Sequence, residues 1–146
     1  MSLTYSFQTA SDLYAKLKRD ADALHGEVSG DHAFNFFVTA YHLKEWIQKD
    51  PSVHSDVKAR MQTAAQSVPY LLCADLANAS KHFVQRGKDE AKRTDVAQGY
   101  GAGRYGVGAY GIGEESITIT RKDGSQRTIL ELREQIMQLY SVVFDG

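Results

Sequence analysis

The segment from Ser67 to Gln85 constrains the fold most, because it is apolar along one side and polar along the other. With a rotation of 100° per residue, its apolar side chains share one broad helical face: Leu72, Cys73, Leu76, Ala77, Ala79, Phe83 and Val84. Asp75, Asn78 and His82 project together from the opposite side, at positions i, i+3 and i+7. The pattern predicts a helix with one packed face and one candidate polar site.

Two further helices are predicted before this segment. Residues 7–27 carry apolar side chains at three- and four-residue spacing with charged residues between them, which is typical of an amphipathic surface helix. Residues 31–49 are apolar in nearly every direction around the axis, through Phe34, Phe36, Phe37, Val38, Tyr41, Leu43, Trp46 and Ile47. A helix that is apolar all round is expected to be central and covered by its neighbours.

A shorter fourth helix is predicted between these two parts of the chain. Asp50 and Pro51 form a restart signal, with an N-cap residue followed by proline at the first helical position. The apolar pattern then continues to about Ser67. Four helices joined by short connections predict an antiparallel, up-and-down four-helix bundle over residues 7–85.

Residues 86–114 are predicted to form a charged and then Gly/Tyr-rich loop. A mixed-charge run is followed by glycine at nearly every second position from 99 to 113, which makes a helix very costly. Two formal GxGxxG matches occur here without a strand before or a helix after them, so no dinucleotide site is predicted. Aromatic and arginine side chains stack on single-stranded bases, which makes Arg104 and Tyr105 candidate binding residues.

Residues 115–146 predict a small β-hairpin followed by a final helix that docks on the bundle. Alternation over 116–120, a turn over 122–125 and a return strand over 126–129 give the hairpin. Thr128 and Glu131 then form a capping box that opens a helix. The whole chain, 1–146, is therefore predicted to be a single, mainly α domain with a minor β element.

Composition narrows the function classes. The net charge of −1 gives no general attraction to phosphate backbones, so nucleic-acid binding would require a local basic patch. Cys73 is the single cysteine and has no intrachain disulfide partner, which is typical of a reduced, cytoplasmic protein. No apolar run approaches about eighteen residues and no signal-peptide pattern begins the chain, so we expect no membrane association.

His82 is the leading chemical candidate of the sequence. A histidine that titrates near neutrality can transfer protons, and Asn78, one turn away, can position a phosphate or hold the ring tautomer. His42 and Glu45 fall on the polar strip of the central helix and are predicted to face this site across the bundle. The plainer alternative is that the stripe forms a satisfied polar network or the solvent face of the bundle.

We expect neither a metal nor a cofactor. Metal binding by His42, His82, Asp75 and Glu45 is a distant third option, which neither an HExxH motif nor a Glu-x-x-His pair supports.

The segment from Ala77 to His82 resembles the signature of the HEPN superfamily. These proteins are helical bundles, often dimeric, and many are ribonucleases of toxin–antitoxin, phage-defence and RNA-processing systems. Their signature is frequently Arg-Asn-x-x-x-His, and here Asn78 and His82 match it while Ala77 stands at the arginine position. The missing guanidinium is the group expected to hold the scissile phosphate, and Lys81 lies at the wrong helical angle to replace it. The chain is also similar to small uncharacterised bacterial and phage proteins.

The sequence favours a non-catalytic, HEPN-like interaction module that binds a protein or RNA partner in a bacterial defence or prophage setting. The alternative is a metal-independent ribonuclease of a toxin or phage-defence system that uses His82 as general acid/base, supported by Asn78 and by Lys81 or His42. In the binding hypothesis the candidate contacts are Asp75, Lys81, His42, Glu45, Arg104 and Tyr105. A homodimer is expected, because the all-round apolar helix needs cover and the hairpin edges need a partner.

Overall fold

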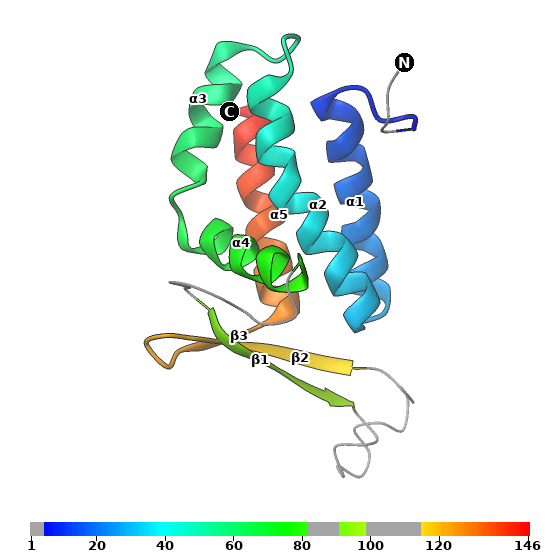
Figure 1. Ribbon diagram of the computed structural model, residues 1–146, viewed down its shortest axis with the longest axis vertical. Coiled ribbons are helices and arrows are strands. Elements are labelled where there is room, and N and C mark those ends of the chain that lie inside the picture. The colour runs from blue at the N-terminus through cyan, green and yellow to red at the C-terminus, as the bar shows by residue number, and fades with distance from the viewer. Residues whose placement is uncertain (1–4, 82–90, 99–114) are drawn as a thin grey trace.

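The structure is a computed structural model that describes residues 5–81, 91–98 and 115–146 (Figure 1). Within these ranges it is mainly helical, with a small three-stranded antiparallel sheet. The elements are α1 (Ala10–Gly26), α2 (Gly30–Lys49), α3 (Ser55–Ala64), α4 (Val68–Lys81), β1 (Ala91–Gln98), β2 (Glu115–Arg121), β3 (Gln126–Thr128) and α5 (Ile129–Asp145).

The helices are not arranged as the predicted bundle of the first four. In Figure 1, α1, α2, α3 and α5 run along the long axis of the molecule, whereas α4 lies across them and the strands form a layer at one end. The last helix, α5, contacts α1, α3, α4 and the strands β2 and β3. An up-and-down four-helix bundle over residues 7–85 is therefore not confirmed, because α5 occupies the place that the prediction gave to α4.

Helix ends follow local sequence signals. The Thr9 side chain accepts a hydrogen bond from the Asp12 N–H, while the Asp12 carboxylate accepts the Thr9 N–H, so α1 begins with a capping box. The capping box predicted for Thr128 and Glu131 is present at the start of α5. The four predicted helix positions and the final helix are thus confirmed as elements, although not in the predicted packing.

The sheet contains one strand more than predicted. The hairpin of β2 and β3 is confirmed, with Gly124 in its turn at a φ of +88°, a conformation that glycine adopts without strain. The additional strand is β1, which pairs antiparallel with β2 in the order β1-β2-β3. Residues 91–98 were predicted to belong to a loop, and this part of the prediction is wrong. Residues 99–114, predicted as the Gly/Tyr-rich loop, lie outside the described residues.

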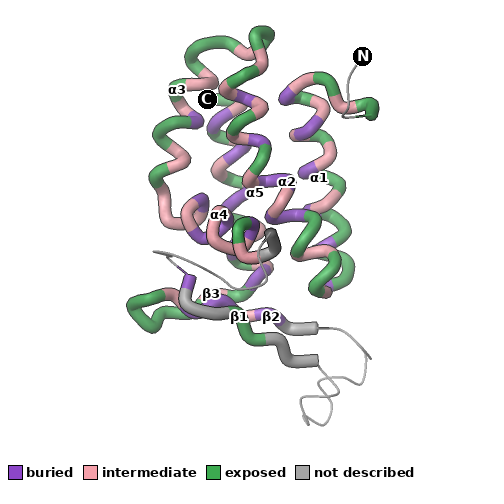
Figure 2. Tube along the Cα trace, viewed as in Figure 1, coloured by how far each residue is buried: buried purple, intermediate pink, exposed green. Residues whose placement is uncertain are grey.

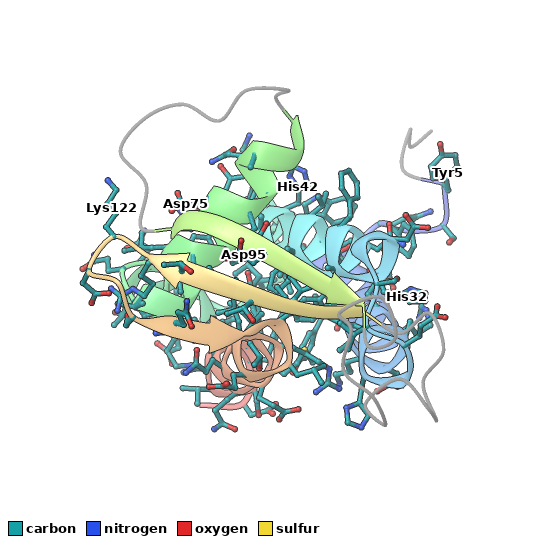
Figure 3. All side chains as sticks on the ribbon, turned by 90° about the horizontal axis from the view of Figure 1, so that it is seen from below. Tyr5, His32, His42, Asp75, Asp95 and Lys122 are labelled. Carbon is teal, nitrogen blue, oxygen red and sulfur yellow. The ribbon has the colours of Figure 1, made fainter. Side chains whose placement is uncertain are left out.

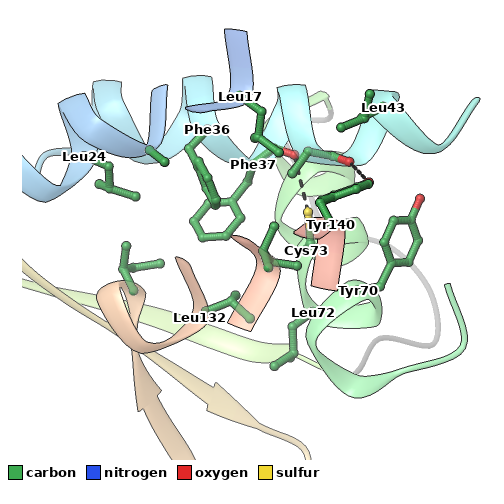
Figure 4. Packing of buried hydrophobic residues seen from close by; sticks show 14 of the residues in the cluster. Leu17, Leu24, Phe36, Phe37, Leu43, Tyr70, Leu72, Cys73, Leu132 and Tyr140 are labelled. Atoms are coloured by element: carbon green, nitrogen blue, oxygen red, sulfur yellow. Dashed lines mark hydrogen bonds between the residues drawn. The ribbon is translucent and has the colours of Figure 1, made fainter. Parts of the chain in front are cut away.

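One continuous core joins the helices to the sheet (Figure 4). Its largest fully buried side chains include Tyr140, Phe36, Leu17, Leu24, Leu43, Ile47, Met61, Leu72, Ile119, Leu132, Ile136 and Val143. The Tyr140 hydroxyl donates a hydrogen bond to the Ala40 carbonyl, which ties α5 to α2. The Cys73 thiol lies 3.5 Å from the Phe37 carbonyl oxygen and is fully buried, as its place on the apolar face of the helix predicts.

Burial around α2 is one-sided. Figure 2 shows buried residues on the inward faces of the helices and exposed residues on the outward faces. Phe36, Phe37 and Ile47 are buried, but Phe34 is 52% exposed and Trp46 is half-buried. The prediction that α2 is covered on every side is therefore wrong at Phe34. No helix in the described ranges is both long and apolar enough to span a lipid bilayer.

Candidate functional site

Asp75 has a structural role. Its Oδ2 atom accepts a hydrogen bond from the Ala91 N–H at 2.8 Å, and its side chain is half-buried. Figure 3 labels Asp75 beside the start of β1, which lies against α4. This contact ties the middle of α4 to the first residue of the sheet, so Asp75 belongs to the packing between the helical layer and the strands.

The predicted stripe of Asp75, Asn78 and His82 is only partly described. Asn78 is exposed on α4. Lys81 is the last residue of α4, and its side chain lies outside the described part of the chain, as do His82, Arg104 and Tyr105 entirely. Within the described residues, Asp75 and Asn78 therefore differ in environment: one is held against β1 and the other faces solvent.

His42 and Glu45 form part of a solvent-facing strip on α2. The His42 ring lies 5.5 Å from the Tyr41 ring, and Glu45 accepts a hydrogen bond from Lys49 at 2.8 Å. This bond, with the positive charge behind it, lowers the pKa of Glu45 and raises the pKa of Lys49. Both His42 and Glu45 are exposed, so their charges are screened by water. Neither residue forms a hydrogen bond or an ion pair with Asp75, so the two polar strips do not meet through the described side chains.

The position that matches the HEPN arginine is buried. Ala77 is 5% exposed and lies on the packed face of α4 with Leu72 and Cys73. A larger side chain at this position would meet packed neighbours on this face of the helix. Within residues 5–81, 91–98 and 115–146, moreover, no group of three or more His, Cys, Asp or Glu residues lies close enough to hold a metal ion.

An open concave surface lies elsewhere, between α3 and α5. It is an open groove of about 790 Å³ with a mainly apolar lining, and we call it the α3–α5 groove. Its lining residues are Arg60, Thr63, Ala64, Ser67, Pro69, Glu134, Gln135, Gln138, Leu139, Val142 and Val143. Val142, at 49% exposure, is one of the exposed large hydrophobic residues of the described chain.

The two charged groups of the groove lie at opposite ends. The Arg60 Nε donates to the Val143 carbonyl at 2.9 Å, which places this cation near the end of α5. Glu134 lies nine residues earlier on the same helix, about 13 Å along the axis at 1.5 Å per residue. Its side chain is 72% exposed, and one carboxylate oxygen accepts a hydrogen bond from Arg133. The groove thus has an apolar middle, a cation at one end and, at the other end, a carboxylate paired with Arg133.

Sequence reasoning missed this groove. The core stripe of α5 accounts for Leu132, Ile136, Tyr140 and Val143, which are all buried. Val142 is an apolar residue outside that stripe, and it is the signal that could have indicated a second contact face. The other wall of the groove comes from α3, and no local pattern shows that α3 lies beside α5.

Two smaller hollows flank α2. One, of about 380 Å³, includes Trp46, Lys49 and Asp50 near the start of α1. The other, of about 200 Å³, lies between α2 and the sheet and includes the exposed ring of Phe34. The predicted binding residue Glu45 lines the first of them, and Asn78, the described candidate of the catalytic pair, lines neither. Comparison of the chain with protein-family models, with curated proteins and with solved structures finds no match.

Proposed function

We propose that this chain is a non-catalytic interaction module and that its α3–α5 groove binds a protein partner. The observation that carries this proposal is the groove itself, an open hollow of about 790 Å³ with a mainly apolar lining and an exposed valine at its wall. Apolar surface of this kind is the usual mark of a contact with another polypeptide, because burying it removes ordered water.

A protein partner fits the groove better than RNA does. RNA binding depends on a basic surface that follows the phosphates and on aromatic rings that stack on bases. The groove is lined by one arginine and one glutamate, so its formal charge is balanced, and none of its lining residues is aromatic. These properties give no preference for a polyanion and suit a polypeptide with an apolar face.

The resemblance around Asn78 and His82 suggests the setting. A HEPN-like protein without the arginine would act in the cytoplasm of a bacterium, in a defence or prophage system, by binding rather than by cutting. Within this proposal the exposed Asn78 is a surface residue, and the ribonuclease remains the alternative that a cleavage assay tests.

Site-specific photo-crosslinking tests the proposed function. A benzophenone amino acid is placed at Gln138, an exposed residue of the groove, and at Arg19, an exposed residue of α1, as the matched control. We expect irradiation of cells that naturally produce the chain to join Gln138, and not Arg19, to one defined polypeptide. Crosslinks to RNA from Gln138, or identical products from both positions, would contradict the proposal.

A further inference from the structure

We infer that the polypeptide bound in the α3–α5 groove is a second copy of this chain, arranged about a two-fold axis. This inference rests on the proposed function and names the partner of the same site. In a two-fold dimer both copies use the same patch, so the patch must be complementary to itself. The shape and the charge of the groove both meet this condition.

The apolar wall of the groove combines one exposed side chain with others that are less exposed. Val142 stands on α5 and is about half exposed, whereas Ala64 and Leu139 line the hollow beside it. When a second copy approaches with its α5 antiparallel to the first, Val142 of each copy enters the hollow of the other. Each copy then covers the apolar surface that the other exposes, and the interface closes after two chains instead of forming an open chain of contacts.

The charges are complementary under the same symmetry. Arg60 lies near the end of α5, and Glu134 lies about 13 Å away toward its start. A two-fold axis through the middle of the groove places Arg60 of each copy opposite Glu134 of the other. The Glu134 carboxylate is exposed and can accept a further hydrogen bond besides the one from Arg133. Two equivalent ion pairs therefore form at the edges of an apolar centre, as in many protein interfaces.

The area of this face predicts a weak dimer. With 17 residues, α5 is about 25 Å long. Two neighbouring helices present a face about 20 Å wide, which gives about 500 Å² per copy. Stable complexes bury about 800 Å² per partner. We therefore expect an equilibrium between one and two chains that shifts with concentration, and not a permanent dimer.

Sedimentation velocity tests the dimer directly. Between about 10 μM and about 1 mM, the mean mass of the purified chain should rise from one copy toward two. Val142→Glu should abolish this rise, because it places a charge on the apolar wall of the groove, whereas Ala23→Glu on an exposed face of α1 should leave it unchanged. A constant mass of one copy, or equal behaviour of the two variants, would overturn the inference.

A charge exchange provides a second test, which loss of folding cannot imitate. In Arg60→Glu alone and in Glu134→Arg alone, both ion pairs of the dimer become like-charge pairs, and we expect dimerisation to weaken about tenfold. In a mixture of the two variants, each mixed dimer again has only opposite-charge pairs, so association should return. Arg19→Glu serves as the control for a charge reversal outside the groove.

The outcomes separate this inference from the proposed function. If the mixture does not associate better than either variant alone, the two-fold arrangement is wrong. A chain that stays single but still crosslinks another polypeptide through Gln138 would overturn the second copy as partner and leave the proposed function standing. Absence of both association and crosslinking would overturn both.

Discussion

The carboxylate of Asp75 on α4 accepts the backbone N–H of Ala91, the first residue of β1, with 2.8 Å between oxygen and nitrogen. In the sequence Asp75 belongs to a polar stripe that predicts a chemical site. In the structure it joins the helical layer to the sheet, and it satisfies a backbone donor at the start of a strand. The packing of α4 against β1 thus explains Asp75, although the sequence does not show that these two elements are neighbours.

Replacing Asp75 with alanine should destabilise the fold, because the Ala91 N–H loses its charged acceptor. Hydrogen bonds to charged groups contribute about 1.5–3 kcal/mol, so we expect the free energy of unfolding to fall by about 2 kcal/mol. Urea unfolding followed by circular dichroism measures this change. Asn78→Ala, one turn further along α4 on an exposed position, is the matched control and should change little. Equal losses in the two variants would mean that the bond to Ala91 contributes nothing.

The helices could be predicted because their signals are local. The capping box of Thr128 and Glu131 lies within four residues, and the apolar stripes repeat every three or four residues. The burial of Leu72 and Cys73 follows from the same periodicity. Such signals identify an element and its inward face without any knowledge of its neighbours.

The order in which the elements pack could not be predicted in the same way. Strand β1 reads AKRTDVAQ, with charged residues and little alternation, and it is a strand because β2 pairs with it across an intervening segment. Likewise, α4 lies across the other helices, and α5 lies beside α3, through contacts between residues far apart in the chain. The α3–α5 groove depends on this long-range packing, so its residues gave no common signal in the sequence.

Stability should fall at alkaline pH, because three buried groups retain their protons in the folded chain. Burial raises the pKa of Cys73, Tyr70 and Tyr140 above their ordinary values. The unfolded chain loses these protons above about pH 8.5 for the thiol and about pH 10 for the phenols. The free energy of unfolding therefore keeps its full value below those pH values. Above them it falls by about 1.4 kcal/mol per group and pH unit. Urea unfolding from pH 7 to pH 11 measures the decline.

The contribution of Cys73 can be separated from that of the tyrosines. Cys73→Ala removes the thiol, so the decline should begin near pH 10 instead of about pH 8.5, whatever the variant costs at neutral pH. The comparison concerns the slope with pH and not the absolute stability. If the free energy of unfolding of the variant falls between these two pH values as steeply as that of the wild type, the thiol is not the cause of the decline.

Asp50 should contribute to stability at neutral pH and lose that contribution in acid. Hydrogen bonds from Ser52 and from the Ala10 N–H, the latter at 2.8 Å, lower the pKa of Asp50. Its stabilisation is thus present above the unfolded value of about 3.9 and is lost as pH falls through the lower folded value. Asp50→Asn should lower the melting temperature at pH 7 by about 2–4 °C, for a loss of about 1 kcal/mol. Asp22→Asn, on an exposed part of α1, is the control. Thermal unfolding should show a smaller difference for Asp50→Asn at pH 3 than at pH 7, and little difference for Asp22→Asn at either pH.

Restoring the arginine of the HEPN signature should damage the fold without creating a ribonuclease. Ala77 is 5% exposed, so Ala77→Arg forces a guanidinium into the packed face of α4 and should cost about 2–4 kcal/mol. Asn78→Arg adds the same side chain at an exposed position and should leave the melting temperature nearly unchanged.

A cleavage assay tests the absence of ribonuclease activity. Labelled single-stranded RNA and transfer RNA should stay intact when they are incubated in EDTA with the wild-type chain, with His82→Ala or with either arginine variant. Cleavage by the wild type that disappears in a His82→Ala variant with unchanged melting temperature would instead establish the ribonuclease and overturn the non-catalytic proposal.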